Sequence, residues 1–137
     1  MGGGTPDAVV ATVAVHANDG TLVATVTGDV DELTVSTIAA RVEDEARAAA
    51  AADLVIDLRP VTFIGSAGLS MLLGVRQDLG PRPVRLVVNP ASMTARLLRI
   101  TELGSVFPLH RQLDEALVAA RAERDGSSED GSGPSSG

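Results

Sequence analysis

The chain has 137 residues, a formal net charge of −7, no cysteine, and only arginine as its strongly basic residue. This length fits one domain with a single core of ordinary size. The absence of lysine excludes a Walker-type phosphate loop, a Schiff base and a Ser-x-x-Lys acylation site, and the absence of cysteine excludes disulfides and thiolate metal sites.

The acidic balance also disfavours nucleic-acid binding, which needs a basic surface to displace counterions from phosphates. No apolar run approaches the roughly 18 residues needed to cross a bilayer, and the N-terminus lacks the pattern of a secretion signal. We therefore expect a cytoplasmic protein that does not act at a membrane.

The first predicted elements are two β-strands and a helix. Residues 1–7 read as a flexible lead, and strands are predicted at about 8–16 and 21–28. Asn18-Asp19-Gly20 between them favours a tight antiparallel hairpin, because these residues tolerate the positive φ of such a turn. Apolar residues then recur at helical spacing from Val35 to Ala46, which predicts a helix over about 35–51.

The middle of the chain alternates strands and helices. The apolar run at 53–58 predicts a strand covered on both faces, and a short turn leads from it into a helix over about 66–79, which Gly80-Pro81 ends. Another strand is predicted at 84–88.

The last part of the chain predicts two further helices. Asn89 as cap and Pro90 as first residue open a helix to about 101, with Met93, Leu97 and Ile100 facing inward. A brief strand at 105–108 and a helix at 111–124 follow. Residues 125–137 have no apolar side chain and read as a disordered tail, whose last six residues are typical of a cloning remnant.

This order predicts a mixed α/β sheet, with an antiparallel hairpin first, largely parallel strands after it, and about four helices. Right-handed crossovers bring the carboxyl ends of parallel strands to one edge, where open α/β sheets commonly bind ligands or partners. The polar residues expected near that edge are Asp29, Asp31, Asp57, Ser66 and Asn89.

The most informative segment is 57–74, in which a buried strand runs through a turn into a helix that begins at Ser66. This segment resembles the signature of the STAS domain, specifically of the bacterial anti-sigma factor antagonists. Weaker matches occur in the right order at Gly28-Asp29-Val30-Asp31, at Asn89-Pro90 and at 100–107. The resemblance covers most of residues 8–122 and implies a STAS domain over 8–124.

The resemblance implies a regulatory protein without a cofactor of its own. In that family the serine at position 66 is phosphorylated, which changes binding to an anti-sigma factor and so regulates sigma-factor-dependent transcription. The implied partner is an ATP-using serine kinase of the histidine-kinase-like ATPase superfamily, and a phosphatase resets the switch. The residues implied or expected to contact the partner are Asp29, Asp31, Gly65, Ser66, Ala67, Gly68 and Asn89.

Alternatives remain open at each of these positions. Ser66 alone reads as a helix cap, and Asp29 and Asp31 as a solvated turn before a helix. Gly68 in the first turn of a helix suggests that something approaches the backbone closely. Gly65 stands where many family members carry an acidic residue, which keeps open a STAS-type subunit of a transport or lipid-trafficking complex without phosphorylation.

An enzymatic role for Ser66 is disfavoured. The esterase elbow needs Gly-x-Ser-x-Gly, and Ile64 occupies the first glycine position. The two histidines, His16 and His110, have no visible partner at this edge and read as surface residues. Asp57, near the end of the buried strand, reads as an acceptor for loop N–H groups, and Ser70 as a minor modification site or a solvated serine.

Overall fold

A computed structural model of the chain describes residues 11–49 and 53–132, with side chains as far as residue 125. The elements are, in chain order, β1 (Thr12–Asn18), β2 (Thr21–Val30), α1 (Val35–Ala48), β3 (Asp53–Asp57), β4 (Val61–Ile64), α2 (Ser66–Leu79), β5 (Val84–Val87), α3 (Met93–Ile100), the 3₁₀ turn η2 (Leu103–Ser105), β6 (Leu109–His110) and α4 (Leu113–Ser132).

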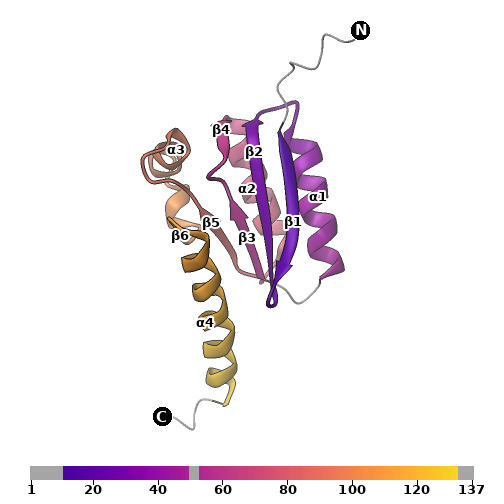
Figure 1. Cartoon of the computed structure of the whole chain (residues 1–137), viewed down its shortest axis with the longest axis vertical. Coiled ribbons are helices and arrows are strands. Elements are labelled where there is room, and N and C mark those ends of the chain that lie inside the picture. Colours follow the sequence, from indigo (N-terminus) through magenta and orange to yellow (C-terminus); the bar gives the residue numbers. More distant parts are fainter. Residues whose placement is uncertain (1–10, 50–52, 133–137) are drawn as a thin grey trace.

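The strands form one mixed sheet in the order β1-β2-β3-β5-β6, with β4 paired to the far end of β2. Among the strands of the described ranges, the β1–β2 pair is antiparallel and the other pairs are parallel. Figure 1 shows α1 and α2 behind the sheet and α4 in front of it, so the sheet lies between two unequal helical layers. The predicted α/β class, opening hairpin and four helices are confirmed.

The hairpin turn follows directly from its sequence. Asn18 pairs with Thr21, which leaves Asp19 and Gly20 as the two loop residues. Both have positive φ, 52° and 87°, as a type I′ turn requires and as aspartate and glycine tolerate at little cost. The turn therefore sets the register of the two strands.

The main core lies between the sheet and the α1–α2 layer. All five residues of β3 are buried, in agreement with its continuous apolar run. A smaller cluster on the opposite face joins Val23, Val55 and Val87 to Ala116 of α4. Both faces of the central strands are thus covered, while β1 stays at the edge with an exposed outer side.

Several predicted boundaries are wrong. The prediction placed a turn where β4 lies, because four residues with two exposed side chains carry little strand signal by themselves. The predicted strand at 105–108 is replaced by η2 and by β6, which begins directly after the predicted range. β1 starts at Thr12 and α1 ends at Ala48; residues 8–10 and 50–51, also predicted to lie in these elements, are outside the described residues.

The predicted start of α3 is also wrong. Asn89 and Pro90 form a turn, and the helix begins at Met93 with Ser92 as its cap, whose hydroxyl accepts a hydrogen bond from Ala95 N at 3.1 Å. The side chain of Asn89 instead accepts a hydrogen bond from Ala91 N at 2.9 Å and so closes the turn before the helix. Ser92, which follows this turn, is therefore the residue that caps the helix.

The last helix differs from its predicted bounds at both ends: α4 runs from Leu113 to Ser132, whereas the prediction was 111–124. The segment after 124 contains glycines but no proline before Pro134, so no residue sterically blocks the helix there. Residues 133–137 lie outside the described residues, and the domain limit at 124 remains a prediction. No helix in the described ranges is long and apolar enough to span a bilayer.

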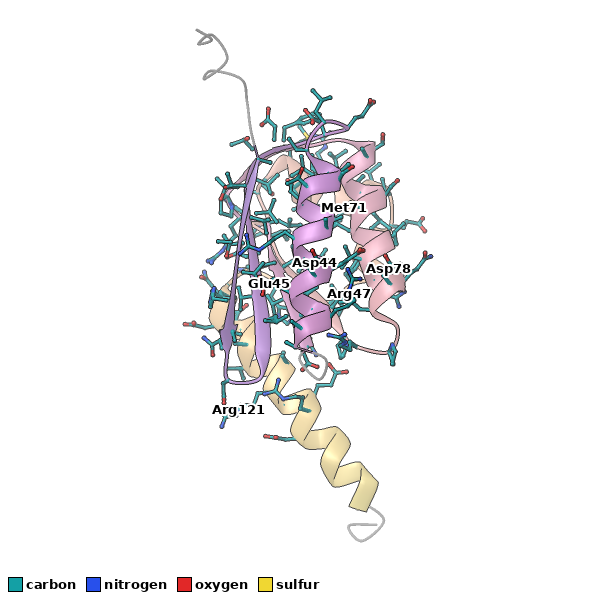
Figure 2. All side chains as sticks on the ribbon, turned by 90° about the vertical axis from the view of Figure 1, so that its right-hand side faces the viewer. Asp44, Glu45, Arg47, Met71, Asp78 and Arg121 are labelled. Carbon is teal, nitrogen blue, oxygen red and sulfur yellow. The ribbon has the colours of Figure 1, made fainter. Side chains whose placement is uncertain are left out.

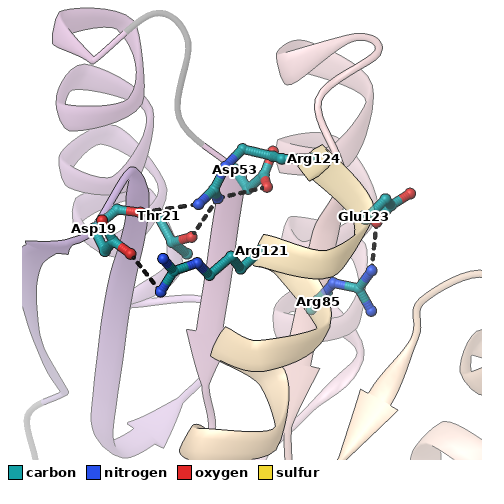
Figure 3. A network of polar contacts seen from close by, with 7 residues as sticks. All are labelled: Asp19, Thr21, Asp53, Arg85, Arg121, Glu123 and Arg124. Atoms are coloured by element: carbon teal, nitrogen blue, oxygen red, sulfur yellow. Dashed lines mark hydrogen bonds and ion pairs between the residues drawn. The ribbon is translucent and has the colours of Figure 1, made fainter. Parts of the chain in front are cut away.

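Polar contacts tie α4 to the hairpin and to β3, and α1 to α2. In Figure 3, Arg124 of α4 reaches Thr21 Oγ1 at 2.9 Å and the buried Asp53 carboxylate at 3.1 Å, while Arg121 pairs with Asp19. Figure 2 shows α1 and α2 side by side, with Asp78 of α2 labelled. Burial, and then a hydrogen bond with Asp78, raise the pKa of Glu43 of α1 above its ordinary value.

Candidate functional site

The amino end of α2 is positioned by the pairing of β2 with β4. In this parallel pair Asp29 lies opposite Phe63 and Val30 opposite Ile64. The backbone N–H of Gly65 then donates to Val30 O at 3.1 Å. Because β2 and β4 end together, the turn into α2 is fixed at the carboxyl edge of the sheet, at the top of Figure 1.

Ser66 is the first residue of α2, and its side chain is exposed. Its interpretation as a helix cap is wrong, because the cap position belongs to Gly65, which has extended backbone and no side chain to donate or accept. Within the described residues, the Ser66 hydroxyl has no hydrogen-bond partner, and the N–H groups of Ser66 and Ala67 have no acceptor. Such unpaired N–H groups favour negative charge at this end of the helix.

Gly65 is not required by the backbone. Its φ is −103°, which any residue adopts, and a Cβ added there would lie 3.4 Å from the nearest atom of the Phe63 ring, an ordinary contact. The position would therefore accept a Cβ without backbone strain. Ala67 is half-buried and lines a shallow groove between α1 and α2 together with Ser70 and Gly74.

The prediction that Gly68 contacts a partner is wrong, because this residue is buried. A Cβ added at Gly68 would lie 2.5 Å from Ile64 Cγ1 and 2.9 Å from Val30 Cγ1. The close approach that its sequence position suggested is real, but the approaching groups are the domain's own strands. Gly68 lets α2 pack tightly on β2 and β4 and so sets the position of Ser66.

Asp29 and Asp31 lie at the end of β2, and both are half-buried. One carboxylate oxygen of Asp29 accepts a hydrogen bond from the Thr62 hydroxyl of β4. Asp31 accepts from Leu33 N at 2.9 Å, and its carbonyl accepts from Thr34 N and Val35 N where α1 begins. Asp31 thus shapes a turn, in agreement with its interpretation as part of a turn before a helix. Asp29 holds β2 and β4 together beside the start of α2.

Asn89 belongs to a different part of the edge. Its side chain, exposed on the β5–α3 turn, lines a depression with Arg59 and Arg111, and this depression does not include Ser66. Asp57 is buried and accepts hydrogen bonds from Arg59 N, at 3.0 Å, and from two guanidinium nitrogens of the same residue. The prediction of Asp57 as an acceptor for the loop is confirmed.

The described histidines do not flank Ser66. His16 is exposed on the edge strand β1, and His110 lies on β6, with β3 and β5 between it and β2. His110 Nε2 lies 3.2 Å from Arg85 Nη1, and its pKa is lowered by burial and by that positive charge. A serine–histidine pair for nucleophilic catalysis is therefore not formed at this site.

The roles of two neighbouring residues at the site were not predicted from the sequence. Thr62 is the partner of Asp29, and Phe63 is a half-exposed aromatic ring beside Gly65. The alternation of buried and exposed positions from Val61 to Ile64 is irregular because the β2–β4 register shifts after Gly28. The one available signal was the rarity of phenylalanine in this chain, which contains two.

Comparison with known proteins identifies the family. The family described as the STAS domain matches residues 12–116. The anti-sigma-F factor antagonist RsfB of Mycobacterium tuberculosis is 33% identical over 123 residues, which cover 87% of this chain and 95% of that protein.

Solved structures agree. A crystal structure of an anti-sigma factor antagonist from Mycobacterium paratuberculosis has a TM-score of 0.74 and 35% identity, covering 81% of this chain and 94% of that one. The antagonist SpoIIAA in its unphosphorylated form, with 16% identity and a TM-score of 0.60 over 79% of this chain and 96% of its own, shares the fold. The chain therefore belongs to the STAS domain family, among the bacterial anti-sigma factor antagonists.

Proposed function

We propose that this chain is an anti-sigma factor antagonist that binds an anti-sigma factor with serine kinase activity and is switched by phosphorylation of Ser66. The relative from Mycobacterium tuberculosis carries the name of such an antagonist. The observation that carries the proposal is the exposed Ser66 hydroxyl, without a partner in the described structure, at the amino end of α2. The protein would act in the cytoplasm, and its binding state would regulate sigma-factor-dependent transcription.

The chain itself would contribute only Ser66, the acceptor of the phosphoryl group. An ATP-using kinase of the histidine-kinase-like ATPase superfamily would transfer the γ-phosphoryl group to Ser66 Oγ, releasing ADP, while a base of the kinase takes the hydroxyl proton. A serine phosphatase would hydrolyse the ester and restore the hydroxyl. Neither step requires a cofactor or a catalytic group from this chain.

The physical effect of phosphorylation follows from the surroundings of Ser66. A phosphoserine adds about 1.5 to 2 negative charges, which the free N–H groups of α2 tolerate within the domain. The residue before Ser66, Gly65, is hydrogen-bonded to Val30, which stands between Asp29 and Asp31, so a partner surface that accommodates the hydroxyl would meet a more strongly negative, bulkier group. Each 1.4 kcal/mol of added repulsion or desolvation weakens binding about tenfold.

The site assignment is tested by incubating the protein with candidate kinases and ATP, followed by mass spectrometry. We expect one phosphate on Ser66, none on the Ser66→Ala variant, and normal labelling of the Ser70→Ala control, whose hydroxyl is exposed one turn further along α2. Label that persists in Ser66→Ala would show that another residue is the acceptor.

The switch is tested separately by binding. Titration with the anti-sigma factor should show that Ser66→Glu binds at least about tenfold more weakly than wild type, while its far-UV circular dichroism spectrum is unchanged. Equal affinities for the two proteins would contradict a charge-based switch, even if Ser66 is phosphorylated.

Gly65 supports a second candidate function, a STAS-type interaction subunit of a transport or lipid-trafficking complex that is not phosphorylated. Since the backbone accepts a Cβ at Gly65, a Gly65→Asp variant introduces an acidic residue without backbone strain. If only this variant is phosphorylated, the native protein has lost the switch and the second function is favoured. Equal labelling of both proteins would favour the antagonist.

A further inference from the structure

Large exposed apolar side chains gather at one edge of the domain. In the described part of the chain they are Leu33, Phe63, Met93, Ile100 and Val118, with exposed fractions of 90%, 49%, 58%, 65% and 67%. The first four lie on elements at the carboxyl edge of the sheet, and Val118 lies on α4 near the hairpin turn, at the opposite edge. Single exposed apolar residues are ordinary, but several on neighbouring elements indicate an interaction surface.

Phe63 is the most informative of them. The chain has two aromatic residues, of which Phe107 is 1% exposed in the core and Phe63 is half-exposed three positions before Ser66. The Phe63 ring lies alongside Gly65, so that a Cβ at Gly65 would be 3.4 Å from it. The missing side chain at Gly65 thus leaves the ring open beside the start of α2.

The helix α3 adds to this surface in an unexpected way. Met93, Leu97 and Ile100 are spaced as one face of a helix and were predicted to point inward, but Met93 and Ile100 are exposed. The buried face instead carries Thr94, Ala95 and Leu98. A helix that contacts β4 (Figure 1) and still exposes Met93 and Ile100 presents these two side chains for an external contact.

The charges around this surface define the partner. Asp29 lies opposite Phe63 in the sheet register, and Asp31 and Glu32 follow directly after β2, next to Leu33. The part of a partner surface that faces Leu33 and Phe63 therefore carries an apolar patch with basic side chains beside it. Because the same edge holds Ser66, a phosphate would enter this contact, and one modification would suffice to disrupt it.

We propose that Leu33, Phe63 and Met93 form an apolar rim around Ser66, and that Phe63 is its anchor for the anti-sigma factor. This inference rests on the proposed function, because the occupant of the rim is the partner that Ser66 regulates. Buried aromatic side chains at the centre of an interface commonly carry a large share of the binding energy. The rim would thus supply affinity, and Ser66 would supply regulation.

The test is a calorimetric titration with purified anti-sigma-F factor of Mycobacterium tuberculosis, the class of protein that the name of the relative says it antagonises. Phe63→Ala should bind at least about tenfold more weakly than wild type, and Phe63→Leu should recover most of that loss. Val118→Ala, which removes an even more exposed apolar side chain at the other edge, should bind as wild type does.

The outcomes separate the two proposals. If Ser66→Glu weakens binding and Phe63→Ala does not, the anchor is wrong and the proposed function stands. If wild type does not bind, the proposed function fails for this partner, and the rim fails with it. Should Phe63→Ala unfold, Met93→Ala is decisive: a loss of about threefold or more supports the rim, and unchanged binding refutes it.

Discussion

Gly68→Ala should destabilise the domain, although alanine is the better helix former. The added Cβ would lie 2.5 Å and 3.0 Å from two Ile64 atoms and 2.9 Å from Val30 Cγ1. Both side chains are fully buried and lie on paired strands, so neither can move without disturbing the core. The helix would have to shift away from β2 and β4.

The expected magnitude combines two opposing effects. Overpacking of a well-packed core costs about 1 to 3 kcal/mol, and replacing glycine by alanine inside a helix returns up to about 1 kcal/mol. The free energy of unfolding should therefore fall by about 1 to 2 kcal/mol. For a domain of this size, that lowers the melting temperature by roughly 4 to 10 °C.

Gly74→Ala is the matched control in the same helix. A Cβ at Gly74 would meet no atom within 4 Å, so this variant keeps only the gain in helix propensity and should be more stable by up to about 1 kcal/mol. The two substitutions are chemically identical and differ only in what surrounds them. Stability changes of opposite sign in the two variants would show that packing determines the effect of the substitution at Gly68.

The assay is urea unfolding followed by far-UV circular dichroism, since the chain has no tryptophan or tyrosine to serve as a fluorescent probe. A lower midpoint with an unchanged m-value would report a change in stability alone. If Gly68→Ala were as stable as wild type or more so, the close packing of α2 on Ile64 and Val30 would be refuted. The account of how Ser66 is positioned would fall with it.

Two further predictions concern the polar contacts of the helices. Arg124→Met should lower the free energy of unfolding in urea by about 1 to 3 kcal/mol, because the Asp53 carboxylate would stay buried without its partner. Arg121→Met breaks an exposed ion pair and should lower it by less than about 1 kcal/mol. Equal losses for the two variants would refute the importance of burial at Asp53. The raised pKa of Glu43 means that the folded state binds more protons between the ordinary and the raised value, so stability falls as pH rises through that window. In thermal unfolding, the stability of Glu43→Gln relative to wild type should therefore increase as the pH is raised from 4 to 7. A stability difference between the two proteins that is the same at both pH values would contradict a raised pKa.

Local sequence signals gave the correct prediction where short-range geometry dominates. The Asp19-Gly20 turn adopts the positive φ values that these residues tolerate, and α2 begins at Ser66 and ends at Leu79, before Gly80-Pro81. Each of these features depends on neighbours within a few positions along the chain. The exposed hydroxyl at the start of α2 is predictable for the same reason.

Signals of the same kind failed where distant segments decide. The stripe of Met93, Leu97 and Ile100 has the correct helical spacing, but periodicity does not say which face of a short helix docks, and the sheet buries Thr94 and Leu98 instead. Likewise β4 is a strand because β2 extends beyond β3 and offers free backbone groups there. Four residues do not encode that pairing by themselves.

By itself, the sequence determined an α/β domain with an opening hairpin and a serine at the start of a helix, because turns, caps and apolar runs act over a few residues. Only the tertiary structure decided that Gly68 faces the core, that Asp29 binds Thr62 and that Phe63 stays open beside Ser66. These outcomes depend on which atoms meet when β2, β4 and α2 pack together. Contacts between segments more than thirty residues apart are set by the fold as a whole, since each can form only once the others have fixed the positions of its partners.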